Sequence, residues 1–286
     1  MNVRMLAKPF RIRQAVLNFT GWPDAGRVVS STLAEMRALL PCEPAAEWDL
    51  DGYWNADALR PEVKVSHGQI RKLEWPTCLF HLCRPPGNAL PILAGEGPEP
   101  GTRWRGFVSE LLQGLRSWGC EELILPGSVY DDVFHDEIVI SGTVQDVRGI
   151  NQMKELECRQ IEYSGPGAIQ SAIMELSPSF GIRCLGIRAH FPFYLKAPHE
   201  LLMARLLGIL GSLLGVEFDT GRLLNAWQKR SGEIAEMIQQ DQDLRQVLDS
   251  LKKEDRGLGP VHGKSKVVRF EEFLKKRNGP TEPEGE

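Results

Sequence analysis

Short apolar runs alternate with longer segments of helical periodicity from about residue 13 to residue 216, and this alternation restricts the fold more than any other feature. Strand, turn and helix in succession form the repeating unit of a parallel sheet. The expected strands lie at 15–19, 78–82, 122–125, 161–163 and 184–187, and the expected helices at about 24–40, 104–119, 169–176 and 198–214. The sequence therefore predicts an α/β fold, a mostly parallel sheet with helices on both faces.

The helix expected at 198–214 is apolar on nearly every side. A helix that is hydrophobic all round must be buried on more than one side. Either the core or a subunit contact has to cover it. Together with the apolar stripe that follows residue 219, it predicts a homo-oligomer, either a trimer or a dimer.

A shift in composition near Asp219 divides the chain. Residues 1–218 are expected to form the α/β domain. Residues 219–256 carry a thin apolar stripe with three- and four-residue spacing, broken at 241–243, which predicts a helical extension of two helices. Residues 257–286 are rich in charge, Gly and Pro, which is typical of a mostly mobile tail.

Charge and hydropathy exclude several partners. With a net charge of −4 and a pI near 6.0, the chain lacks the excess of positive charge that neutralises nucleic-acid phosphates, so no nucleic-acid partner is expected. The longest apolar stretch, 206–216, is shorter than the ~20 residues of a spanning helix, and the apolar run at 15–17 is too short for a signal peptide. We therefore expect a cytoplasmic protein without a membrane contact.

The six cysteines are scattered through a chain that is long enough to form a core without disulfides, so they are expected to be reduced and mostly buried. Reductant should therefore not change unfolding. Cys78, His81 and Cys83 are close in sequence. In a strand, however, positions 78 and 83 point to opposite faces, and no second ligand pair has zinc-like spacing. No metal and no cofactor are expected, since the common phosphate-loop, dinucleotide and nucleophile-elbow motifs do not occur in the sequence.

The turns that leave the strands are the remaining places for a site, because parallel strands deliver their carboxyl ends to one edge. The candidate residues that would line a cleft there are Trp22, Asp24, Gly26, Glu99, Tyr163, Gly165, His190 and Tyr194. The alternative is structural: Asp24 caps a helix, the glycines satisfy turn geometry, and the aromatic rings plug the end of the sheet. If the cleft exists, Asp24 and Tyr163 should share one small-ligand pocket.

Two further acid–base candidates have simpler explanations. Glu96 and Glu99 lie three residues apart, but the Gly and Pro residues around them prevent a shared helix face. His135 precedes an expected strand at 137–140 and could act as a general base, although a hydrogen-bonded structural histidine is the more common case.

Several motifs in order resemble the proteasome assembly chaperone 2 family of bacteria and archaea. They are Gly21-Trp22-Pro23-Asp24-Ala25-Gly26, then Asp49-x-Asp51-x-Tyr53, Gly97-Pro98-Glu99-Pro100, Tyr163-x-Gly165-Pro166 and Pro192-x-Tyr194. The resemblance covers roughly residues 12–250. It implies a fold similar to that of purine nucleoside phosphorylases and related hydrolases, a C-terminal helical extension, frequent homo-oligomers and protein partners in proteasome assembly.

We therefore expect a non-catalytic protein-binding or assembly protein, because no activated nucleophile or metal set is visible. The alternative is a small-molecule, nucleoside-like binding protein or enzyme that uses the cleft at the strand-to-helix turns.

Overall fold

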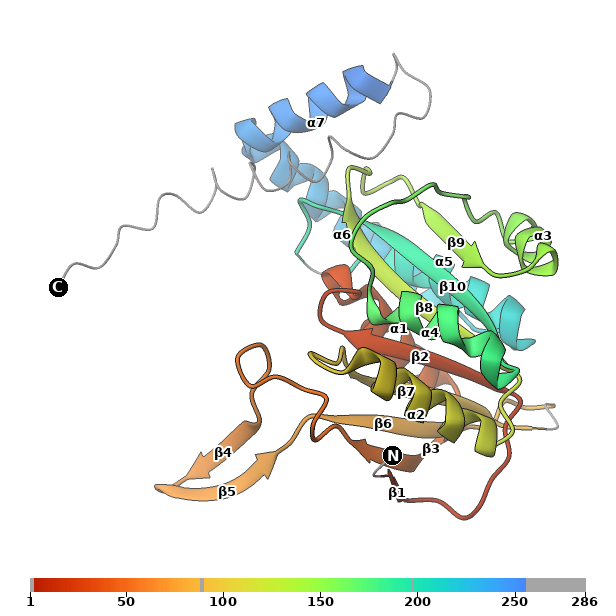
Figure 1. Cartoon of the computed structure of the whole chain (residues 1–286). Helices are drawn as coiled ribbons and strands as arrows, with labels where there is room; N and C mark the ends of the chain where they lie inside the picture. Colours follow the sequence, from red (N-terminus) through yellow and green to blue (C-terminus); the bar gives the residue numbers. More distant parts are fainter. Residues whose placement is uncertain (1–2, 88–89, 197, 256–286) are drawn as a thin grey trace.

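Eight strands form one sheet in the order β1-β3-β6-β7-β2-β8-β10-β9 (Figure 1). The computed structural model describes residues 3–87, 90–196 and 198–255. The strands are, in that spatial order, β1 (Val3–Met5), β3 (Cys42–Asp49), β6 (Thr77–Cys83), β7 (Ile92–Pro98), β2 (Gln14–Thr20), β8 (Glu122–Asp131), β10 (Arg183–Pro192) and β9 (Ile140–Val144). A separate two-stranded sheet pairs β4 (Glu62–Ser66) with β5 (Gln69–Glu74).

The large sheet is mixed, which corrects the prediction of a mostly parallel one. Only β7, β2, β8 and β10 pair in parallel, and the flanking pairs are antiparallel. β7 was not among the expected strands, so 78–82 was expected to be the strand before the next helix. Only residues 84–91 separate β6 from β7, and so short a connection cannot make the crossover that parallel neighbours need. The strand expected at 161–163 is also wrong, because these residues form an exposed loop.

Helices cover both faces of the sheet, as predicted. α1 (Val28–Leu39) and α5 (Glu200–Leu214) pack in the core on one face, and α2 (Trp104–Ser117) and α4 (Ile169–Leu176) in the core on the other. The remaining elements are η1 (Ala25–Arg27), η2 (Ser177–Phe180) and α3 (Val147–Glu155), which contacts β9. Among the described residues, no helix is both long and apolar enough to span a bilayer.

The apolar helix α5 is covered within the chain. It contacts α1, β10 and α6 (Gly221–Gln240), so the core provides the cover that the sequence demanded. Two ion pairs hold α6 in place: Arg222 binds Glu35 of α1, and Arg230 binds Glu200 of α5 at 2.7 Å. The apolar surface of α5 therefore no longer argues for an oligomer.

The second expected helix of the extension, α7 (Gln242–Asp255), begins just after Asp241, where the sequence predicted a break. The division of the chain at residues 218 and 219 stays a prediction, and the expected mobile tail at 257–286 lies outside the described residues.

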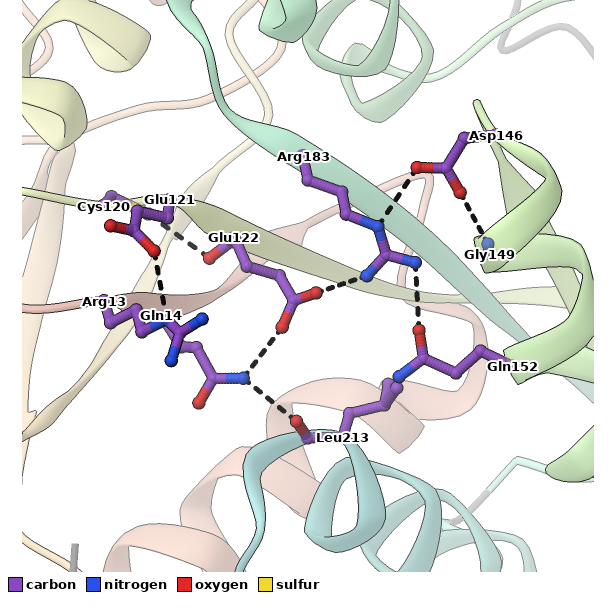
Figure 2. A network of polar contacts seen from close by, with 10 residues as sticks. All are labelled: Arg13, Gln14, Cys120, Glu121, Glu122, Asp146, Gly149, Gln152, Arg183 and Leu213. Carbon is purple, nitrogen blue, oxygen red and sulfur yellow. Dashed lines mark hydrogen bonds and ion pairs between the residues drawn. The ribbon is translucent and has the colours of Figure 1, made fainter.

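A polar network ties the amino ends of β2, β8 and β10 together (Figure 2). Arg183 binds Glu122 and also Asp146, whose Oδ2 lies 3.2 Å from Nε. The Gln14 amide donates to Glu122 at 2.8 Å and to the Leu213 carbonyl of α5 at 3.0 Å. Gln14, Glu122 and Arg183 are also direct partners in the sheet register. The network therefore fixes the alignment of three strands and anchors the end of α5.

The cysteines correct the prediction that all six are reduced. Cys42 of β3 and Cys83 of β6 form a disulfide between paired antiparallel strands, so reductant should affect stability after all. Disulfides are rare in a reducing cytoplasm, so this bond and the expected cytoplasmic location point in opposite directions. The strand geometry itself is confirmed, because Cys78 and Cys83 pack in the cores on opposite faces of the sheet.

We predict that the protein unfolded without reductant titrates four thiols and that reduction raises the number to six. The four are Cys78, Cys120, Cys158 and Cys184, which are buried in the fold and unreactive there, since burial raises the pKa of all four and brings that of Cys78, Cys120 and Cys184 to about 12. Breaking the disulfide should lower the free energy of unfolding by roughly 2–4 kcal/mol. As a control, Cys78→Ser should titrate three thiols without reductant. Six thiols in the unreduced, unfolded protein would contradict the bond.

Candidate functional site

The carboxyl ends of β7, β2, β8 and β10 lie at one edge of the sheet, because these strands are parallel. Asp24 follows β2, Glu99 follows β7, and Tyr194 follows β10. The loop that holds Tyr163 reaches the same edge, since Glu99 accepts a hydrogen bond from the first N–H of α4, at Ile169. We take this edge as the candidate site.

Asp24 acts as a helix cap, in line with the structural alternative. Its Oδ1 accepts hydrogen bonds from the backbone N–H of Val29 at 2.9 Å and of Ser30 at 3.4 Å, and its Oδ2 from the Ser30 hydroxyl. The side chain is buried. The carboxylate therefore satisfies backbone donors at the start of α1 and is not directed at solvent.

Gly26 serves the packing of this turn. Its φ of +61° lies in the left-handed region, and a Cβ added there would come within 2.4 Å of the Phe191 ring at the end of β10. A side chain at position 26 would push the turn away from the sheet. Trp22, four residues earlier, is exposed.

Glu96 and Glu99 serve different helices. Glu96 pairs with Arg37 of α1 at 3.4 Å, whereas Glu99 bonds the Ile169 N–H of α4 at 2.7 Å. Burial raises the pKa of both carboxyl groups, and these contacts counteract part of the rise. They do not form an acid–base pair.

Tyr163 and Gly165 belong to the exposed loop before α4. The Tyr163 hydroxyl donates to the Pro166 carbonyl at 2.9 Å, so the ring folds back over the loop. A Cβ at Gly165 would come within 2.6 Å of that hydroxyl oxygen. This glycine allows a close approach by Tyr163.

His190 lies between a carboxylate and a hydroxyl. Its Nδ1 is 2.8 Å from Asp131 Oδ2 at the end of β8, and its Nε2 is 2.8 Å from the Ser141 Oγ of β9. The order acid, imidazole, hydroxyl is that of hydrolase triads. Ser141, however, is only 1% exposed. A substrate cannot reach this hydroxyl. The hydrogen bonds from Asp131 through His190 to Ser141 instead link the strands β8, β10 and β9.

Tyr194 takes part in a separate cluster on the α5 side of the sheet. Its hydroxyl accepts a hydrogen bond from the His135 N–H at 2.8 Å and lies 2.8 Å from Nδ1 of the same residue. Burial raises the pKa of Tyr194 above its ordinary value. His135 is therefore hydrogen-bonded, as its structural alternative supposed.

His199 completes this cluster. Its Nε2–H donates to the His135 carbonyl at 2.7 Å, its Nδ1 accepts from the Leu202 N–H at 3.2 Å, and its ring stacks on Trp227 of α6. Burial lowers its pKa to about 4. Protonation of Nδ1 would place its N–H against the N–H of Leu202, which now donates to it. The fold therefore stabilises the neutral form of the imidazole.

The eight candidate residues thus share an edge but divide among different contacts, and a single cleft lined by all of them stays a prediction. Two open hollows of about 680 and 620 Å³ lie along α6 and beside β9, and no candidate residue lines either.

Sequence reasoning missed Asp131, Ser141, Arg188 and His199. One signal was available: after its first residue, Arg183, β10 is apolar except at Arg188 and His190, and these alternate positions place both on one face of the sheet.

We predict that His199 makes the protein less stable as the pH falls from about 6.5 to about 4. The unfolded state, with a histidine pKa of 6.5, binds the proton first, whereas the folded state binds it only near pH 4. The stability present above pH 6.5 should fall by about 3 kcal/mol over this window. Unfolding by urea at pH 7, 5.5 and 4 measures the change.

His199→Gln should flatten this part of the pH dependence, because glutamine does not titrate. His67→Gln, at an exposed residue in the β4–β5 turn, serves as the control and should keep it. Equal pH dependence in the wild type and His199→Gln would contradict the assignment.

Comparisons with known proteins agree with the fold and the motifs. The model of the PAC2 family matches residues 18–238. The solved structure of a proteasome-assembly chaperone homologue from Mycobacterium tuberculosis is 26% identical, covers 82% of this chain and 98% of its own, and superposes with a TM-score of 0.74. A PAC2 family protein from Streptomyces avermitilis is 25% identical, with coverages of 79% and 95% and a TM-score of 0.68.

A protein of unknown function from Corynebacterium glutamicum shares the fold at 19% identity, with coverages of 88% and 96% and a TM-score of 0.77. No curated protein sequence matches the chain. The family match spans more than half of the 286 residues and confirms the resemblance in the motifs. The chain therefore belongs to the PAC2 family.

Proposed function

We propose that this chain is a non-catalytic protein-binding and assembly protein, and that its first contact is with a second copy of itself through the β4–β5 hairpin. The exposed apolar face of this hairpin is the observation that carries the proposal. The name of the M. tuberculosis relative, a proteasome-assembly chaperone homologue, supports an assembly role for the family.

The hairpin projects from the body of the protein (Figure 1). Val63 pairs with Leu73 and Val65 with Ile70, so all four side chains lie on one face. All four are exposed, Ile70 by 73%. On the opposite face Lys64 and Lys72 bind Glu74. The arm is thus amphipathic, with its apolar face uncovered by the rest of the described chain.

An isolated two-stranded hairpin is at best marginally stable in water. Trp75 extends the apolar face beyond β5 and is also exposed. The largest apolar patch of a typical monomer measures ~300–600 Å² and is often functional. A symmetric contact between two copies counts the patch twice, which brings the covered area toward the ~1,200 Å² at which specific interfaces begin. This area argument favours a second copy, arranged as a dimer.

We predict that light scattering coupled to size exclusion gives about twice the chain mass of 32.1 kDa for the wild type at micromolar concentration. The double variant Val65→Ser, Ile70→Ser should give the mass of one chain, because it removes the centre of the apolar face.

A matched control is Val147→Ser with Leu224→Ser, which removes two exposed apolar side chains from α3 and α6 and should leave the dimer intact. A wild type that runs as a monomer, or a hairpin variant that keeps the doubled mass, would contradict the proposed contact. A tripled mass would contradict the symmetric pairing of two hairpins.

The second candidate function is a small-molecule, nucleoside-like binding role at the carboxyl edge, for which a likeness to nucleoside phosphorylases would be the structural basis. The observation in its favour is a set of polar residues on one face of β10. His190 contacts Ser141, and Arg188 contacts Gln170 of α4 and lies near the exposed Tyr163 loop. The inaccessible Ser141 hydroxyl favours binding over catalysis there.

A further inference from the structure

Arg188 differs from the other partly buried arginines of the described chain. Five arginines are partly buried there: Arg37, Arg183, Arg188, Arg205 and Arg230. Four of them bind a carboxylate, namely Glu96, Glu122 with Asp146, Glu157 and Glu200. Within the described residues, no acidic side chain lies within 4.0 Å of the Arg188 guanidinium.

Among the described residues, Arg188 has one side-chain hydrogen-bond partner, a neutral amide. Its Nη2 donates to the Gln170 Oε1 at 3.2 Å, and Gln170 in turn donates to the Pro126 carbonyl at 2.6 Å. A guanidinium has five N–H donors and remains protonated in proteins. Burial of a charge is costly unless the charge is paired, and burial lowers the pKa of Arg188. Arg188 therefore lacks the counter-charge that the other four arginines have.

Arg188 is partly exposed, and this exposure gives a ligand access to it. It is aligned with Gly127 of β8, over which the Gln170 side chain packs, and with Ser141 of β9, whose hydroxyl contacts His190. Tyr163 lies near enough to influence Arg188 electrostatically, and its loop is exposed. The first N–H of α4 is already bonded to Glu99, so the charge of Arg188, and not the helix terminus, is the feature that attracts an anion.

We propose that Arg188 binds the phosphate or carboxylate group of a small molecule at the carboxyl edge, between β10, β9 and the Tyr163 loop. A planar guanidinium matches two oxygens of either group with paired hydrogen bonds. Gln170, the hydrogen-bond partner of Arg188, is neutral and therefore does not compete with an anion for its charge. The site is independent of the hairpin contact, so either proposal can fail alone.

The test uses the full chain, with inorganic phosphate and acetate as probes. At constant ionic strength, with chloride as the reference anion, phosphate or acetate should raise the Tm of the wild type and give a saturable calorimetric binding curve. A response to phosphate alone or to acetate alone identifies the preferred group.

Arg188→Gln should weaken binding of the active probe at least tenfold. Without ligand its Tm should equal or exceed that of the wild type, since it removes a partly buried charge that has no carboxylate partner. Arg188→Lys keeps the positive charge but loses the paired N–H donors of the guanidinium, so it should bind with intermediate affinity. Arg148→Gln removes an exposed arginine of α3 and should bind as the wild type does.

Three results would overturn the proposal: no response of the wild type beyond chloride to either probe, equal binding by Arg188→Gln and the wild type, or an Arg188→Gln protein that loses stability without ligand as well as binding. The last would mean that Arg188 serves the fold. Circular dichroism of each variant reports whether it folds.

Discussion

The alignment of the parallel strands β2, β8 and β10 is the constraint on which the rest of the molecule depends, and Arg183 holds it. The side chain joins Glu122 and Asp146, and Glu122 joins Gln14, so the first residues of three strands are fixed to one another (Figure 2). A one-residue slip of a strand turns every side chain to the opposite face. The same contact that aligns the sheet therefore decides that Arg188 and His190 face α4.

Most polar groups at the carboxyl edge are used by the fold. Asp24 bonds the start of α1, Glu99 bonds the start of α4, and His199 bonds the backbone at both ring nitrogens. Each satisfies backbone groups that would otherwise be left without a partner where helices meet a buried surface. An edge rich in Asp, Glu and His is thus compatible with a protein that performs no chemistry there.

The features predicted correctly from the sequence are those that depend on the local pattern of apolar residues. Helices on both faces, the burial of α5 and the break near Asp241 all follow from apolar periodicity, which short segments display directly. The mixed sheet could not be predicted in this way, because pairing direction depends on which strands become neighbours. β7 was not recognised because it contains two glycines and a proline, which are rare within strands. The Cys42–Cys83 bond joins residues that only strand pairing brings together. The cap at Asp24 was foreseen as an alternative, since its spacing to the helix is local.

Arg188 shows why the site is harder to predict than the fold. Its type and strand position are visible in the sequence, but its significance lies in the missing counter-charge, which depends on every element packed around it. Arg183, five residues earlier on the same strand, has two carboxylates, whereas Arg188 has a neutral amide. Because a partly buried cation without a counter-charge costs stability, the proposed anion would stabilise the protein by pairing with Arg188. It would bind at the edge of the sheet opposite to the network that aligns the strands.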